Sequence, residues 1–137
     1  MEQPKWGRVL FGGLVAGLLI NVFVLGPALA AAHLSLGSAP RATVVAALLM
    51  AVLVFFVTFM VTWIYAALRP RYGPGMKTAA MAGVASALVL GFFEYIEWVL
   101  TSRMIPAKVW ATNVGITSLA LLIAGLVGAW VYEKHSS

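Results

Sequence analysis

Long uncharged stretches are the feature that most limits what this chain can fold into. No Asp, Glu, Lys or Arg interrupts residues 9–40, 42–68 or 109–132. Each stretch can hold the roughly 20 apolar residues that an α-helix needs to cross the hydrocarbon core of a bilayer. The sequence therefore predicts at least three membrane-spanning helices.

A fourth apolar stretch covers about residues 76–100 and is weaker only because it contains Glu94 and Glu97. The chain is 63% hydrophobic and only 9% charged, with a mean hydropathy of +1.00. Soluble domains carry roughly 25% charged residues. We therefore expect an all-α fold, a membrane-spanning four-helix bundle that forms a single domain over residues 1–137 and leaves no room for a soluble domain.

Prolines and glycines mark the expected ends of these helices. Ser38 and Pro40 are typical of a helix start, and the basic segment RPRYGPG at residues 69–75 has two prolines and two glycines that end one helix and begin the next. The predicted helices cover about residues 6–31, 40–68, 75–102 and 106–132.

The two halves of the chain show weak internal similarity. TWIYAAL, with Trp63 and Tyr65, aligns with AWVYEKH, with Trp130 and Tyr132. Each half has two predicted spans, so this similarity would correspond to two tandem helical hairpins of the same orientation.

The distribution of basic residues predicts the orientation of the chain. Lys and Arg are enriched in cytoplasmic loops, so both termini and the central loop are expected in the cytoplasm and the chain in the inner (cytoplasmic) membrane as a multi-pass protein. The net charge of +5 is spread over helix ends rather than along one face, which favours contact with anionic lipid over nucleic acid. The inner side holds Lys5, Arg8, Arg69, Arg71, Lys77 and Lys134, and the outer side holds Arg41, Arg103 and Lys108.

Aromatic residues near the predicted span ends are typical of interfacial belts, where the rings lie at headgroup level. The inner belt would contain Trp6, Trp63, Tyr65, Tyr72, Trp130 and Tyr132, and the outer belt Trp98 and Trp110.

The first segment also imitates a signal peptide. Lys5 and Arg8 precede an apolar run, and residues 28–30 read Ala-Leu-Ala, like a cleavage site. Because this run is longer than a typical signal-peptide core, we expect a retained helix.

Two segments resemble an uncharacterised family of small bacterial four-helix membrane proteins. WGRVLFGGLVAGLLIN opens the chain, and YAALRPRYGPGMKTA contains the family's central loop, R-P-R-[FY]-G-P-G-x-K-T-A. Where the family often has Glu three residues after the Asn of its first helix, this chain has Val24. The resemblance covers most of the chain and implies the four-helix architecture and a bacterial membrane, but no established activity. The matching residues are Arg8, Val9, Ala16, Gly17, Leu18 and Asn21, and residues 69–79.

Small residues at four-residue spacing predict the faces on which the helices pack, because membrane helices associate through close backbone approach and hydrogen bonds. Most such faces serve packing within a bundle, and docking of a separate chain is the alternative. Asn21 extends the first stripe and is expected to hydrogen-bond a neighbouring helix rather than a ligand. The stripes contain Gly13 and Gly17; Ala79, Gly83, Ala87 and Gly91; and Ala124 and Gly128.

Glu94 and Glu97 form the candidate polar site. Their three-residue spacing places them about 60° apart on a helix, beside the small-residue stripe, so we expect both to face protein in the outer third of the membrane. Their expected neighbours are His33, Arg41, Arg103 and Lys108.

Three interpretations of this cluster remain open. The carboxylates could form structural ion pairs with Arg41 or Arg103, which would offset the cost of burying charge. They could exchange protons or cations, as ionisable residues inside membranes often do. A metal or porphyrin site would need His33, and because the chain has only two histidines we expect no metal and no cofactor.

The residue inventory argues against enzyme activity. There is no Cys for disulfide or thiol chemistry and no Asp for a Ser-His-Asp set, and no zinc-protease or phosphate-loop motif occurs. We therefore expect a non-enzymatic subunit of a larger membrane complex, for example an energy-transducing one, with partners among other membrane chains or copies of itself. The alternatives are a carrier of protons, cations or hydrophobic ligands that uses Glu94 and Glu97, and a pigment- or haem-binding membrane protein.

Overall fold

Four α-helices make up the computed structural model, which describes residues 5–33, 41–100 and 106–134. Each helix is long and apolar enough to cross a membrane, so the predicted all-α, multi-pass architecture is confirmed. The helices are α1 (Trp6–His33), α2 (Arg41–Tyr72), α3 (Met76–Leu100) and α4 (Ala107–Lys134). Side chains are described for residues 5–23, 45, 48–100 and 106–134.

The end of α2 differs from the prediction. The helix does not stop at Leu68 but continues through Pro70 to Tyr72. A proline in the last turn removes a single backbone hydrogen bond, close to the point where the helical hydrogen bonds end in any case. The helix ends instead at Gly73, whose φ of 80° is the left-handed conformation that glycine adopts without strain and whose N–H bonds the Arg69 carbonyl at 2.9 Å.

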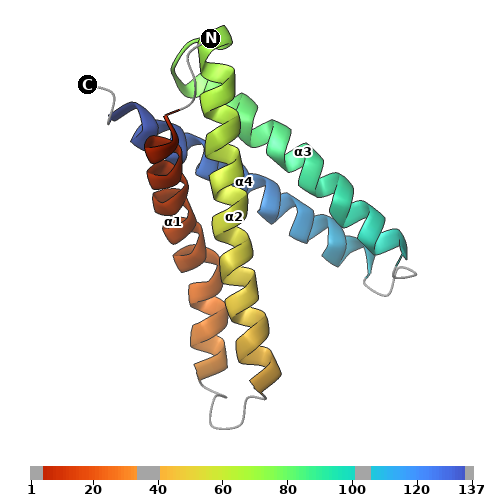
Figure 1. Cartoon of the computed structure of the whole chain (residues 1–137). Helices are drawn as coiled ribbons and strands as arrows, with labels where there is room; N and C mark the ends of the chain where they lie inside the picture. Colours follow the sequence, from red (N-terminus) through yellow and green to blue (C-terminus); the bar gives the residue numbers. More distant parts are fainter. Residues whose placement is uncertain (1–4, 34–40, 101–105, 135–137) are drawn as a thin grey trace.

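The helices pair as two tandem hairpins, α1 with α2 and α3 with α4, as expected from the internal similarity (Figure 1). The hairpins meet at one end of the molecule, formed by the start of α1, the end of α2, the start of α3 and the end of α4. We call it the closed end. From there the hairpins diverge, and among the described residues α1 makes no contact with α3 (Figure 1).

Burial follows this divergence. In the described part of α2, buried residues occur only from Thr58 onward. In α3 they occur only up to Ser86, and in α4 only from Leu121 onward. The remaining parts of the second hairpin, residues 87–100 and 107–120, contain no buried residue. We call them the open end. The four helices therefore pack together over only part of their length.

Small residues explain why α3 and α4 are closest near the closed end. A Cβ on Gly83 would lie 2.9 Å from the Leu122 Cα, and a Cβ on Gly125 would lie 2.8 Å from the Ala79 carbonyl oxygen. At Gly91 the nearest atom to such a Cβ is a Val114 methyl at 3.8 Å, so the helices are farther apart there.

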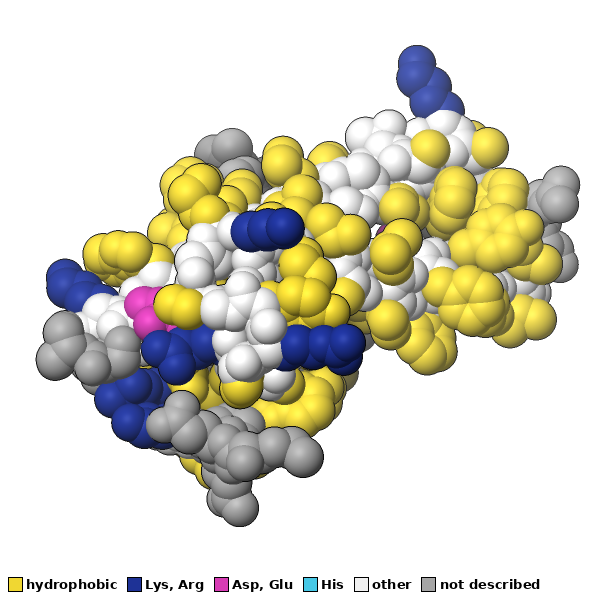
Figure 2. Space-filling view, turned by 90° about the horizontal axis from the view of Figure 1, so that it is seen from above, with side chains coloured by type: hydrophobic (Ala, Val, Ile, Leu, Met, Phe, Trp, Pro, Cys, Tyr) yellow, Lys and Arg dark blue, Asp and Glu magenta, His cyan; other side chains and the backbone are white. Residues whose placement is uncertain are grey.

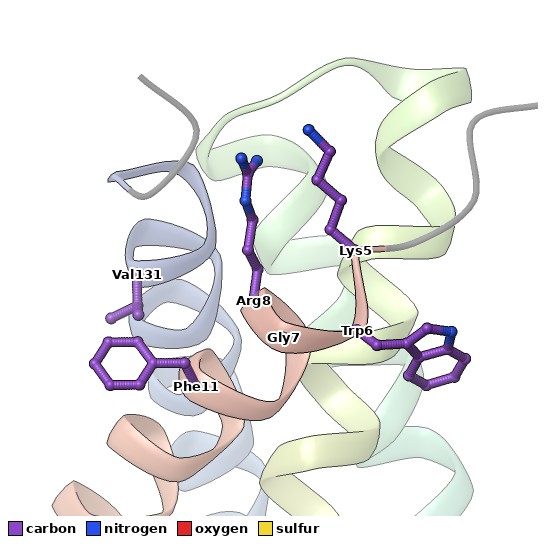
Figure 3. Close-up of a pocket in the computed structure, with 6 residues that line it drawn as sticks. All are labelled: Lys5, Trp6, Gly7, Arg8, Phe11 and Val131. Atoms are coloured by element: carbon purple, nitrogen blue, oxygen red, sulfur yellow. The ribbon is translucent and has the colours of Figure 1, made fainter.

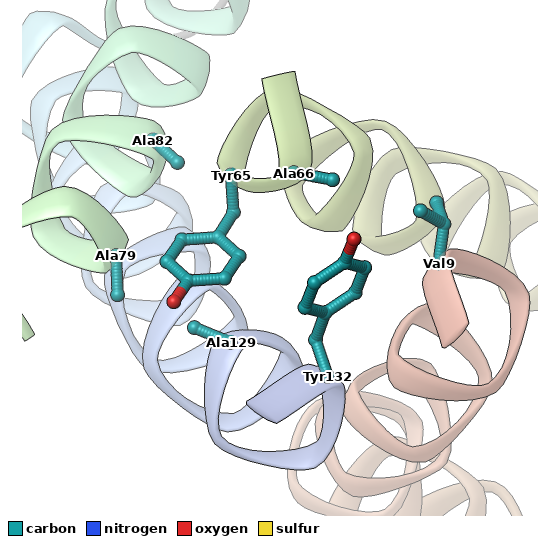
Figure 4. Close-up of a cluster of buried hydrophobic side chains, with 7 residues drawn as sticks. All are labelled: Val9, Tyr65, Ala66, Ala79, Ala82, Ala129 and Tyr132. Atoms are coloured by element: carbon teal, nitrogen blue, oxygen red, sulfur yellow. The ribbon is translucent and has the colours of Figure 1, made fainter. Parts of the chain in front are cut away.

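Two tyrosines lie inside the core rather than in an interfacial belt. Tyr65 is fully buried and Tyr132 is 5% exposed, and their rings meet edge to face with centroids 5.8 Å apart (Figure 4). The belt prediction is therefore wrong for these two residues, because both hydroxyl-bearing rings point between the helices. Trp6, Tyr72 and Trp130 are at least half exposed, as a belt requires.

Candidate functional site

The most connected polar group of the described chain is Glu133, near the end of α4. Arg69, near the end of α2, contacts it twice, from Nε to Oε1 at 2.6 Å and from Nη2 to Oε2 at 3.1 Å. The Tyr65 hydroxyl donates to the same Oε1 at 2.8 Å. We call Tyr65, Arg69 and Glu133 the Glu133 cluster. It joins the first hairpin to the second.

The central loop is tied to this cluster. The Gly75 N–H donates to the Tyr65 hydroxyl oxygen at 3.4 Å, and the Thr78 hydroxyl donates to the Gly73 carbonyl at 2.8 Å. The Arg69 guanidinium also lies 5.9 Å from the centroid of the Tyr132 ring. The Arg69 charge and both Glu133 oxygens are engaged in these contacts, so the arrangement holds the central loop and two helices together.

Sequence reasoning placed Arg69 in a loop and gave Glu133 no role. The available signal was the position of Glu133, an acid that ends an uncharged stretch at the same membrane side as Arg69. The sequence does not indicate that Tyr65 points at the same carboxylate; the structure shows it.

Basic side chains gather at the closed end. Figure 2 views this end and shows several Lys and Arg side chains on it, some of them next to an acidic group. Arg71 lies over the Tyr72 ring, 5.6 Å from its centroid, and Lys134 over the Trp130 ring at 4.9 Å. The fold thus brings together the basic residues that the sequence assigned to one membrane side: Lys5, Arg8, Arg69, Arg71, Lys77 and Lys134.

Glu94 lies at the open end, partly buried between α3 and α4. The Thr117 hydroxyl of α4 hydrogen-bonds its carboxylate, and the Trp110 indole N–H donates to its backbone carbonyl at 3.4 Å. The Glu97 side chain is exposed. The structure thus differs from the expectation that both carboxylates face protein, because the described residues of this part of α3, 87–100, include none that is buried.

Two of the cationic residues expected near the glutamates belong to the first hairpin. His33 ends α1 and Arg41 begins α2, at the tip of the first hairpin, which Figure 1 shows apart from the tip of the second. The side chains of His33 and Arg41, and all of Arg103, lie outside the described residues. Their pairing with the glutamates stays a prediction.

Three aromatic rings join α3 to α4 beside Glu94. Trp98 and Trp110 stack with centroids 5.2 Å apart and an interplanar angle of 22°. Tyr95 meets Trp110 at 5.9 Å. A groove of about 400 Å³ runs along the same two helices, lined in part by Gly91, Trp110 and Ser118.

No family model, curated protein or solved structure matches this chain. The resemblance to the small four-helix family stays a prediction. Among the described residues, no group of three or more His, Cys, Asp or Glu side chains comes together.

The stripe on α1 lies against α2. A Cβ on Gly13 would lie 2.7 Å from the Phe59 Cα, and one on Gly17 would meet the Phe55 ring. Asn21, one turn further, donates from Nδ2 to the Gly17 carbonyl at 2.9 Å and to the Ala51 carbonyl of α2 at 3.5 Å. Asn21 therefore bonds an adjacent helix.

The other predicted packing residues divide between the two ends of the second hairpin. Gly83 contacts the α4 backbone, and Gly128 lies against the Thr62 side chain of α2. Ala87 and Gly91 instead line the open-end groove. Two close approaches were not predicted: Gly12 against the Gly128 carbonyl, and Gly125 against α3.

Proposed function

We propose that this chain is a non-enzymatic membrane subunit that packs into a larger membrane complex through the open end of its second hairpin. The observation that carries the proposal is that the open end of two membrane-spanning helices contains no buried residue among those described and exposes large apolar side chains such as Phe92, Phe93 and Ile116. Inside a membrane, helices associate through close packing and hydrogen bonds between them. A partner helix would add packing contacts to a region where α3 and α4 are farther apart than at the closed end.

The chemistry of the open end suits a protein partner. The Trp98 and Trp110 rings give rigid apolar area, and Phe92 and Phe93 are each 62% exposed. Aromatic anchors are enriched at the energetic centres of interfaces. The expected partner is therefore a transmembrane helix with an apolar face that packs against these aromatic rings.

The closed end needs no partner to be complete. Its helices approach backbone to backbone at Gly13, Gly83 and Gly125, and its central carboxylate is bonded by Arg69 and Tyr65. This contrast directs the proposed contact to the open end.

Site-specific photocrosslinking in native membranes tests the proposal. A photoreactive residue replaces Phe93, which is 62% exposed on the open end, or as a matched control Leu14, which is 51% exposed on α1 beside the closed end. We expect a crosslinked product from the Phe93 position and none from Leu14. A product with another chain or with a second copy supports the proposal. A particle of only 14.6 kDa after mild extraction, with no crosslink at Phe93, would overturn it.

For the orientation we propose that the closed end faces the cytoplasm of a bacterial cell, because the basic residues gather there. The chain has no cysteine, so a maleimide can label only a cysteine that is introduced, and the labelling shows on which side of the membrane that residue lies. On intact cells, a membrane-impermeant maleimide should label Pro106→Cys at the opposite end and leave Arg71→Cys unlabelled. The reverse pattern would contradict this orientation.

A second candidate function is transport of protons or cations through Glu94. The observation that favours it is a partly buried carboxylate bonded to Thr117 near a groove of about 400 Å³. In liposomes with a pH-sensitive dye, Glu94→Gln with Glu97→Gln should abolish flux, whereas Lys108→Gln at the same end should not. Equal flux in the folded double variant would exclude this function.

A further inference from the structure

A pocket of about 380 Å³ lies at the closed end, on the side where α1 begins (Figure 3). It is formed between the first turns of α1 and the last turns of α4. Its lining residues are Lys5, Trp6, Gly7, Arg8, Phe11 and Val131. This pocket is separate from the Glu133 cluster and from the open end.

Two cations share one side of this pocket. The Lys5 and Arg8 side chains extend in the same direction, past the start of α1 (Figure 3). Neither forms an ion pair with a described residue, and the described acid of this end, Glu133, is bonded to Arg69. The pocket therefore presents two positive charges without a described counter-charge.

The position of these cations on the helix makes an anion more favourable. The Lys5 carbonyl accepts the first helical hydrogen bonds, from the Arg8 N–H at 2.9 Å and the Val9 N–H at 3.2 Å. Lys5 and Arg8 thus lie at the positive end of the α1 dipole, and the first turn contains no acidic residue. Cations are unfavourable at that end and anions are favourable, so an anion would relieve repulsion as well as add attraction.

The apolar side chains of the pocket lie deeper than the cations. Phe11 is about 4.5 Å farther along the helix than Arg8, at about 1.5 Å per residue. Figure 3 shows Phe11 beside Val131 of α4, below the Lys5 and Arg8 side chains. Phe11 is 46% exposed, and Trp6, whose ring stacks on Phe59 of α2 with centroids 6.5 Å apart, is 54% exposed.

We propose that Lys5 and Arg8 bind the phosphate of an acidic membrane lipid, whose acyl chain then runs down along Phe11 and Val131. The vertical order of the pocket, charge above and apolar rings below, matches a lipid, whereas a free phosphate ion would gain nothing from the apolar part. The pocket lies where α1 starts, at the boundary between lipid headgroups and hydrocarbon in a membrane-spanning arrangement.

Native mass spectrometry of the purified chain tests this site. The chain is released from vesicles that contain equal amounts of phosphatidylglycerol and phosphatidylcholine, and the retained lipids are counted. We expect preferential retention of phosphatidylglycerol, reduced by about tenfold or more in the double variant Lys5→Gln with Arg8→Gln, since each basic residue contributes about 1 kcal/mol to binding an anionic surface.

The matched control is Arg71→Gln with Lys77→Gln, which removes the same charge from the same end outside the pocket. It should keep the preference. Equal losses in the two double variants would show a diffuse attraction and overturn the proposed site. Displacement of the lipid by millimolar glycerophosphate as effective as by phosphatidylglycerol would assign the pocket to soluble phosphate, which also overturns the proposal.

A measurement on the unaltered chain covers the case in which the double variant does not fold. Phosphatidylglycerol with a photoreactive group in its acyl chain should label the peptide that contains residues 5–11. Labelling spread evenly over all four helices at this end would contradict the proposed site.

Discussion

Arg69 and Glu133 join the two helical hairpins through a two-point ion pair, with contacts of 2.6 Å and 3.1 Å between the guanidinium and the carboxylate. Arg69 belongs to the first hairpin and Glu133 to the second, and the Tyr65 hydroxyl completes the set of donors. The two side chains are 29% and 28% exposed, so the pair is only partly screened by solvent. Helices that diverge elsewhere are thereby held together at one end.

Glu133→Ala should destabilise the folded chain by about 1.5–3 kcal/mol, because it leaves the Arg69 guanidinium and the Tyr65 hydroxyl without their acceptor. The free energy of unfolding can be measured by titrating SDS into detergent micelles that contain the chain. Tyr65→Phe should cost less, since it removes one hydrogen bond and leaves the ion pair.

Arg71→Gln is the control for this prediction. Arg71 is exposed, lies two residues from Arg69 and contacts the Tyr72 ring. Its replacement should change the unfolding free energy by less than about 0.5 kcal/mol. If Glu133→Ala were as mild as Arg71→Gln, the pair would not hold the hairpins together.

The sequence predicted the four helices because crossing a bilayer requires long apolar helical runs, and these are visible in composition alone. The end of α2 was missed because Pro70 usually signals termination, whereas in the last turn it costs one bond. Tyr65 and Tyr132 were assigned to a belt because sequence position gives depth but not the direction of a side chain. Tertiary packing turned both rings inward.

The candidate sites were predictable to different degrees. Spacing identified the stripes of small residues, and Gly13, Gly17 and Gly83 lie at helix contacts. Spacing could not show that the contact between α3 and α4 loosens before Gly91, because that depends on the angle at which these two helices cross. Nor could the neighbours of Glu133 be foreseen, since Arg69 is separated from it by 64 residues.

Gly125→Ala should separate α3 from α4 and destabilise the fold by about 1–3 kcal/mol, the usual cost of overpacking. The added Cβ would lie 2.8 Å from the Ala79 carbonyl oxygen and 3.3 Å from the Gly83 nitrogen, both backbone atoms that cannot rotate away. Thermal unfolding in detergent, monitored by circular dichroism, measures the effect.

Gly115→Ala, in the same helix, is the matched control. A Cβ there meets nothing within 4 Å, so stability should stay unchanged or rise through the better helix propensity of alanine. Equal destabilisation by both substitutions would mean that glycine in α4 is required for something other than close approach.

Thr58→Val should weaken the contact between α1 and α2 by about 0.6 kcal/mol, the average for hydrogen bonds between membrane helices. The Thr58 hydroxyl is buried and lies 3.0 Å from the carbonyl oxygens of Gly13 on α1 and Phe55 on its own helix. Valine keeps the shape and removes the donor. The same SDS titration reports the change.

Thr112→Val serves as the comparison for Thr58, since the exposed Thr112 hydroxyl bonds only the Lys108 carbonyl of its own helix, at 2.9 Å. It should have little effect on unfolding. If Thr112→Val lowered the free energy of unfolding as much as Thr58→Val does, the hydrogen bond between helices would contribute nothing beyond the bond within the helix.

Gly73→Ala should destabilise the turn between α2 and α3 by about 1 kcal/mol. The φ of Gly73 is 80°, a left-handed conformation that costs a residue with a Cβ roughly 1–2 kcal/mol. No atom lies within 4 Å of the added methyl group, so the penalty comes from the backbone alone and not from a clash.

Gly7→Ala, equally free of neighbours but without positive φ, should cost nothing. Because Gly73 also ends α2 and accepts the Thr78 hydroxyl, hydrogen exchange should show faster opening of the last turn of α2 in Gly73→Ala than in Gly7→Ala. Equal exchange in the two variants would mean that the conformation of Gly73 does not limit how α2 ends.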